Sequence, residues 1–121
     1  MGFPVLIALA FVLVSITFMK KRGNVHGMLL EHVRAEISKV DAGIIRLIAK
    51  RQELVNRVAE IKIRDGIAIQ DKKRTAEVLE SVFNQAVENR IDPVSVQKIF
   101  EILIAMSEER QHERSGDGNL P

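Results

Sequence analysis

The fold is decided by residues 30–64, which read LEHVRAEISKVDAGIIRLIAKRQELVNRVAEIKIR. Aliphatic residues recur in this stretch at alternating spacings of three and four, the period of one face of a long α-helix. The row is Leu30, Val33, Ile37, Val40, Ile44, Leu47, Leu54, Val58 and Ile61, with Arg51 at one of its positions. Asp65 and Gly66 supply a stop. The pattern predicts a first helix of about 36 residues, about 54 Å long.

Two shorter helices are predicted after a connection at residues 67–70. Asp71 is a good N-cap for the second helix, which we expect to end near Asn89. Asp92 followed by Pro93 marks the start of the third helix, which we expect to continue to about Arg110. The apolar residues of these two helices are Val78, Leu79, Val82, Phe83, Ala86 and Val87, and then Val96, Ile99, Phe100, Leu103, Ile104 and Met106. No strand is predicted, so the fold class is all-α.

The three helices differ in length, and this difference bears on the oligomeric state. Helices of about 27 and 31 Å cannot cover the apolar row of a 54 Å helix along its whole length. A single chain would therefore leave several aliphatic side chains in water. We expect a homodimer formed through the first helix.

The two ends of the chain differ in character from the middle. Residues 3–19 are apolar or small apart from Ser15 and Thr17, and Lys20, Lys21 and Arg22 follow directly. This segment is a candidate membrane anchor, with the rest of the chain in the cytoplasm by the positive-inside rule. Alternatively, translation starts at Met28 and the segment is not made. We divide the chain into the apolar segment 1–27, a folded domain 28–113 and a disordered tail 114–121.

Charge and composition exclude several function classes. All 16 acidic residues lie at or after Glu31, and three of the 18 basic residues lie at positions 20–22. Residues 28–121 thus carry 15 basic and 16 acidic side chains, a balance that disfavours nucleic-acid binding. The sequence has no cysteine, and His26, His32 and His112 lack metal-ligand spacing. No metal or cofactor is expected.

Polar residues that interrupt the apolar rows are the candidates for a binding site. Arg51 takes an aliphatic position, and Lys62, eleven residues on, lies within about 20° of the same face and about 16 Å away. Ser107 and Gln111 interrupt the third helix in a similar way. Arg34 lies about 25 Å from Arg51 along the axis, so in an antiparallel dimer it would serve the partner's pocket. Each of these residues taken alone also has a structural interpretation, as a solvated charge or a hydroxyl bonded to its own helix.

Taken together, these residues resemble the all-α chorismate mutases over about 80 residues without a gap. The matching positions are Val33-Arg34-Ala35-Glu36-Ile37, Asp41, Arg51, Lys62, Asp71-x-x-Arg74, Phe100, Ser107 and Gln111. The resemblance implies a three-helix chorismate mutase type II fold, an intertwined homodimer and a reaction without cofactor. That reaction is the rearrangement of chorismate to prephenate in phenylalanine and tyrosine biosynthesis.

The resemblance also implies a role for each site residue. Arg51 and Lys62 would hold the enolpyruvyl carboxylate, while Ser107 and Arg34 of the partner subunit would face the ring carboxylate. Lys62 and Gln111 would donate to the ether oxygen of the breaking bond. The substrate-binding set is completed by Asp71, by Arg74, which adds positive field, and by Thr75.

One position departs from the family's pattern. Relatives usually have a glutamate, which holds the ring hydroxyl, at the position of Thr75. A neutral hydrogen bond is roughly half as strong as a charge-assisted one, so affinity or substrate choice is expected to differ. Isochorismate pyruvate lyase, on the same fold, is therefore an alternative. A membrane-tethered helical dimer without enzymatic activity is a second alternative.

Overall fold

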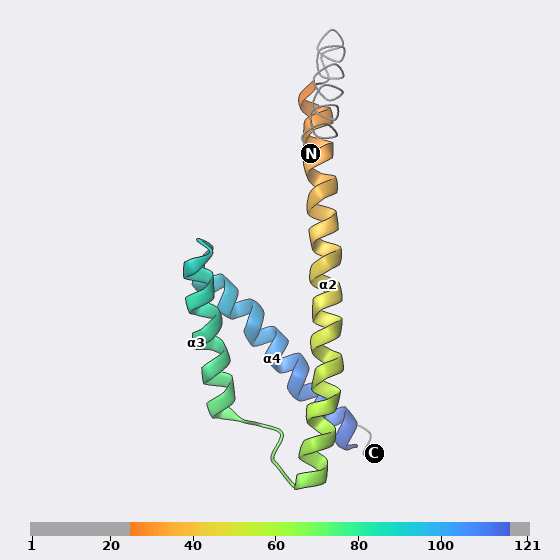
Figure 1. Cartoon of the computed structure of the whole chain (residues 1–121), viewed down its shortest axis with the longest axis vertical. Coiled ribbons are helices and arrows are strands. Elements are labelled where there is room, and N and C mark those ends of the chain that lie inside the picture. The colour runs from red at the N-terminus through yellow and green to blue at the C-terminus, as the bar shows by residue number, and fades with distance from the viewer. Residues whose placement is uncertain (1–24, 117–121) are drawn as a thin grey trace, which may run out of the picture. The chain divides into compact units, whose positions relative to one another are not determined.

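The computed structural model describes residues 25–116, which form three helices and, within that range, no strand. They are α2 (Val25–Asp65), α3 (Lys72–Glu88) and α4 (Pro93–Ser115), shown in Figure 1. The predicted all-α fold with one long first helix is confirmed. The candidate anchor at residues 3–19 lies outside the described residues. No helix within 25–116 is long and apolar enough to cross a membrane.

α2 runs for 41 residues and begins before the predicted domain boundary at residue 28. Its end is the one that the sequence predicted. Gly66 adopts a left-handed φ of 65°, and the backbone N–H of Ile67 donates to the carbonyl of Lys62 at 2.9 Å. Because a glycine meets no Cβ penalty in this conformation, it can close the last turn of the helix.

The chain divides into two compact units, with the boundary inside α2 between Ile44 and Ile45. The described part of the first unit, residues 25–44, is one stretch of helix in which no residue is buried. The second unit holds the remainder of α2 together with α3 and α4. Its buried apolar residues are Val55, Ala59, Val82, Ala86 and Leu103.

Within the second unit, α3 and α4 pack against each other as a hairpin. The side chains of Asp71 and Asp92 cap the two helices by accepting from the backbone N–H groups of Arg74 and Ser95. The amide of Gln97 donates to the carbonyl of Leu79 at 3.1 Å and so joins the two helices. Both predicted caps are confirmed, and they fix where the hairpin begins and turns.

The predicted end of the third helix is wrong. α4 continues past Arg110 to Ser115, and Gly116 caps it with a φ of 86°. Arg114, assigned from sequence to the disordered tail, is helical and pairs with Glu60 of α2 at 2.6 Å. The helix runs on because residues 94–115 contain no glycine or proline that would interrupt its hydrogen bonds.

The predicted row of α2 is not the face that packs inside the second unit. Val55 and Ala59 are buried there, whereas Leu54, Val58 and Ile61 are 42–46% exposed. The helix is thus turned so that the neighbouring face meets α4. The spacing predicted the helix correctly, but it could not show which of two adjacent apolar faces the same chain covers.

Candidate active site

Side chains of α2, α3 and α4 in the second unit surround a pocket of about 450 Å³. That volume counts all the open space of the hollow, including solvent at its mouth. The pocket is lined by Arg51, Lys62, Asp71, Arg74, Thr75, Val78, Ile104, Ser107, Glu108 and Gln111. Every site residue predicted from sequence except Arg34 is in this group.

Arg51 interrupts the apolar row of α2, and its guanidinium points toward α4. Nη1 donates to the carbonyl of Leu103 at 3.0 Å and to the hydroxyl of Ser107. That hydroxyl donates in turn to the same carbonyl at 2.9 Å. Burial, and secondly the positive charge of Arg74, lower the pKa of Arg51 from its usual value. Arginine nevertheless stays protonated in proteins, so a fixed cation lies at this wall.

Lys62 lines the same pocket eleven residues further along α2 and is held by the connection between α2 and α3. Its Nζ donates to the backbone carbonyl of Ile69 at 2.7 Å. The lysine is therefore positioned by a neutral acceptor and has no carboxylate partner in the described structure. An anionic ligand entering the pocket would meet an ammonium that no carboxylate pairs with in the described structure.

Gln111 lies on the buried side of α4 and is 6% exposed. Its Nε2 donates to the carbonyl of Ser107 at 3.3 Å, while its Oε1 is buried without a hydrogen-bond partner. A buried polar atom left unpaired is destabilising. The unpaired atom is an acceptor, so a donor such as a ligand hydroxyl would complete the contacts of this amide.

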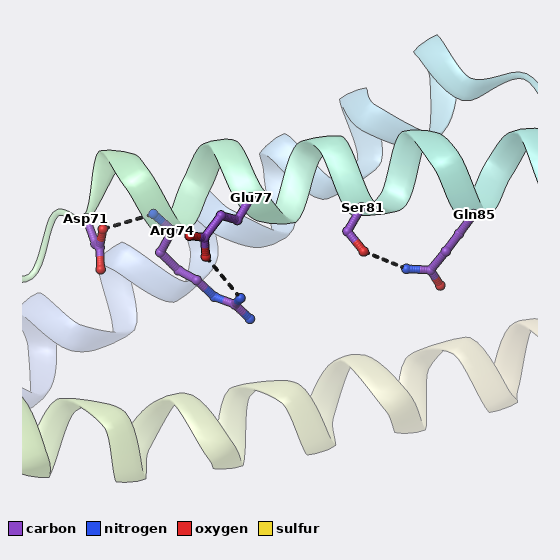
Figure 2. Close-up of polar contacts among 5 residues, drawn as sticks. All are labelled: Asp71, Arg74, Glu77, Ser81 and Gln85. Carbon is purple, nitrogen blue, oxygen red and sulfur yellow. Dashed lines mark hydrogen bonds and ion pairs between the residues drawn. The ribbon is translucent and has the colours of Figure 1, made fainter.

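Residues at the start of α3 form the third wall, and Figure 2 shows their side chains along one side of that helix. Asp71 accepts from the backbone N–H of Arg74 at 2.9 Å, and the guanidinium of Arg74 lies 3.8 Å from Glu77. Thr75 is half-buried in the pocket wall. Asp71 therefore acts first as a helix cap, while Arg74 contributes positive charge.

A second pocket, of about 550 Å³, adjoins the first because Arg51 and Arg74 line both. Its other lining residues are Glu77, Val78, Ser81, Val82, Gln85 and Phe100. Ser81 accepts from the amide of Gln85 at 3.0 Å, as Figure 2 shows. The two arginines thus lie between the two pockets of this unit. A ligand bound to both arginines would border both pockets.

Arg34 belongs to the first unit and does not line either pocket. Its guanidinium is exposed and lies 2.8 Å from Glu31, one turn earlier on α2. Sequence reasoning also missed one charged pocket residue, Glu108, which directly follows Ser107. Its spacing of four from Ile104 and three from Gln111 places it on the same side of α4 and was the signal available.

The charges of the first pocket suit a small dianion. Three cations, Arg51, Lys62 and Arg74, face two carboxylates, Asp71 and Glu108. Neutral hydrogen-bonding groups are supplied by Ser107, Gln111 and Thr75. Among residues 25–116 no group of three or more His, Asp or Glu side chains is arranged to hold a metal ion.

Comparisons with known proteins agree with this geometry. Residues 33–112 match the family model described as chorismate mutase type II. The chain is 37% identical over 75 residues to a chorismate mutase of Methanocaldococcus jannaschii, covering 62% of this chain and 76% of that protein.

Two relatives from Buchnera aphidicola are much longer proteins. The chain is 34% and 28% identical, each over 74 residues, to their bifunctional chorismate mutase/prephenate dehydratases. Those matches cover 61% of this chain and 19% of each relative. No solved structure matches the chain. The resemblance read from the sequence is confirmed, and the chain belongs to the chorismate mutase type II family.

Proposed function

We propose that this chain rearranges chorismate to prephenate in the pocket lined by Arg51, Lys62, Ser107 and Gln111. The observation that carries the proposal is the gathering of these four residues, spread over 61 positions of sequence, around one cavity. Family membership supports the same reaction. The product would enter phenylalanine and tyrosine biosynthesis.

The cationic walls would hold the substrate's two carboxylates. In the described structure Arg51 and Lys62 donate to neutral backbone carbonyls, those of Leu103 and Ile69. A carboxylate accepts more strongly than a neutral carbonyl, so the enolpyruvyl carboxylate would take over these donors. Holding both ends of a flexible molecule would favour the compact conformation in which the reacting carbons approach each other.

The rearrangement is unimolecular, so it needs no nucleophile and transfers no proton. One C–O bond breaks, one C–C bond forms, and negative charge grows on the ether oxygen in the transition state. Lys62 would donate to that oxygen together with the amide of Gln111, whose side chain lines the same pocket. Donors that are already oriented stabilise such charge without reorganisation.

A homodimer is part of the proposal. In the first unit Val33, Ile37, Val40 and Ile44 form an aliphatic row that is 50–62% exposed. Covering such a row with a second copy would remove apolar surface from water. Each Å² of apolar surface buried stabilises the dimer by about 25 cal/mol. The second copy would also bring Arg34 of the partner subunit to the ring carboxylate beside Ser107.

The N-terminal segment carries a separate proposal from sequence. Residues 3–19 would anchor the chain to the membrane, with Lys20, Lys21 and Arg22 on the cytoplasmic side. Fractionation of cells, followed by sequencing of the mature N-terminus, tests this proposal. A mature chain that starts at Met28 and is recovered apart from membranes would overturn it.

The reaction is tested by adding the purified chain to chorismate and separating the products. Loss of chorismate with formation of prephenate supports the proposal. Thr75, where relatives usually have a glutamate, makes isochorismate pyruvate lyase the second candidate, which would release salicylate and pyruvate from isochorismate. Turnover of neither substrate would leave a helical dimer without enzymatic activity.

A further inference from the structure

We infer that Glu108 recognises the ring hydroxyl of the substrate and thereby sets which cyclic dicarboxylates the pocket accepts. The inference rests on the proposed function, because it takes a hydroxylated ring dicarboxylate as the ligand. It adds a specificity-determining residue that lies on α4, on a wall other than that of Thr75.

Of the carboxylates that line the two pockets, Glu108 is the one that neither caps a helix nor forms an ion pair in the described structure. Asp71 caps α3, and Glu77 pairs with Arg74 at 3.8 Å. Glu108 has no hydrogen bond or ion pair with any residue of the range 25–116. It is half-buried in the pocket wall, and its carboxylate has no protein donor in the described structure.

The neighbours of Glu108 show what its carboxylate would meet. Ser107 and Gln111, which belong to the buried side of α4, line the pocket on either side of it. Thr75 lines the same pocket from α3. The ligand-facing groups of α4 are therefore a hydroxyl, a carboxylate and an amide, and the carboxylate is the strongest acceptor among them.

The charge balance shows why a carboxylate is tolerated in a site for a dianion. Three cations and two carboxylates line the pocket, which leaves one positive charge in excess. A bound dianion would reverse this excess, and Arg34 of the partner subunit would bring the total to zero. Removing Glu108 would leave the occupied site with a net positive charge.

Two effects of Glu108 on a ligand follow from its charge. A hydroxyl that donates to a carboxylate forms a charge-assisted bond, roughly twice as strong as a neutral one. The same charge repels the ligand's carboxylates and so favours the orientation in which they face Arg51 and Lys62. A ring without the hydroxyl would meet the repulsion and gain no bond in return.

The test compares the wild-type chain with Glu108→Gln, which keeps the shape of the side chain and removes its charge. Glu109→Gln, an exposed neighbour outside the pocket, is the matched control. The probes are two bicyclic ether dicarboxylates that mimic the transition state, one with and one without the ring hydroxyl, titrated by calorimetry. Chorismate turnover is measured in parallel.

We expect Glu108→Gln to weaken the hydroxylated probe about tenfold and to leave the other probe unchanged or bound more tightly. KM for chorismate should rise by a similar factor, with a smaller change in kcat. Equal weakening of both probes would show a structural role, and no change in either would show a bystander. Both results would overturn the inference while leaving the proposed function standing.

A wild-type chain that fails to turn over chorismate would instead contradict the proposed function. A second variant keeps the two questions apart, because Thr75→Glu places a carboxylate on α3, in the wall of the same pocket. We expect it to restore the preference for the hydroxylated probe in Glu108→Gln and to weaken binding in the wild type by repulsion. An equal effect in both backgrounds would contradict a shared role for the two positions.

Discussion

The two units of this chain use the same helix in different ways. In the second unit, α2 turns Arg51, Val55 and Ala59 toward α3 and α4 and helps to build a pocket lined by charged and polar side chains. In the first unit, residues 25–44 carry an aliphatic row that no other part of residues 25–116 buries. One unit thus provides the candidate binding site, and the other carries the surface through which we propose that two copies meet.

The largest effect is expected at the pocket. Lys62→Ala should lower kcat for chorismate at least about a hundredfold, because a preoriented donor to a developing oxyanion contributes about 3 to 4 kcal/mol. Lys39→Ala is the control, since Lys39 lies in the first unit and pairs with Glu36 on the surface. Steady-state kinetics measure the effect, in variants whose melting temperature matches that of the wild type. A rate near that of the wild type would remove Lys62 from the mechanism.

The next prediction concerns Arg34, which has charge but no pocket in its own unit. Arg34→Ala should lower kcat/KM for chorismate by about ten- to a hundredfold through loss of a charge-assisted contact to a carboxylate. Arg46→Ala, another exposed arginine of α2, is the control.

Mixing variants tests whether Arg34 acts across subunits. When Arg34→Ala and Lys62→Ala chains assemble together, half of the dimers are mixed, and each mixed dimer has one intact site. Activity should recover to about a quarter of the wild-type value. A mixture no more active than its two components would show that each chain uses its own Arg34.

A substitution in the aliphatic row of the first unit probes the dimer itself. Val40→Glu should raise the dimer dissociation constant by at least about tenfold, since it buries an unpaired carboxylate between the copies. Ser38→Glu, about half a turn away on α2, is the control. Analytical ultracentrifugation gives both constants, and equal dimerisation of the two variants would place the interface elsewhere.

The smallest effect is expected at the start of α3, where capping and charge can be separated. Asp71→Ala should lower the free energy of unfolding by about 1 kcal/mol, whereas Asp71→Asn should leave it almost unchanged, because asparagine caps as well as aspartate. Denaturant unfolding measures both. Equal loss of stability in the two variants would mean that the charge of Asp71 matters more than its cap.

Local signals in the sequence determined where α3 and α4 begin and how α2 ends. Asp71, Asp92 with Pro93, and Gly66 each satisfy backbone groups within a few residues, so their effect does not depend on the rest of the fold. The family also followed from sequence, since the spacing of Arg51, Lys62, Ser107 and Gln111 is a property of the chain itself.

Only the tertiary structure decided which face of α2 turns inward, that Glu108 lines the pocket, and that α4 reaches Glu60 through Arg114. Burial is a property of two surfaces that meet, and a single helical pattern fits several partners equally well. The sequence of α4 placed Glu108 beside Ser107, but the packing of α3 and α2 around it made it part of a site.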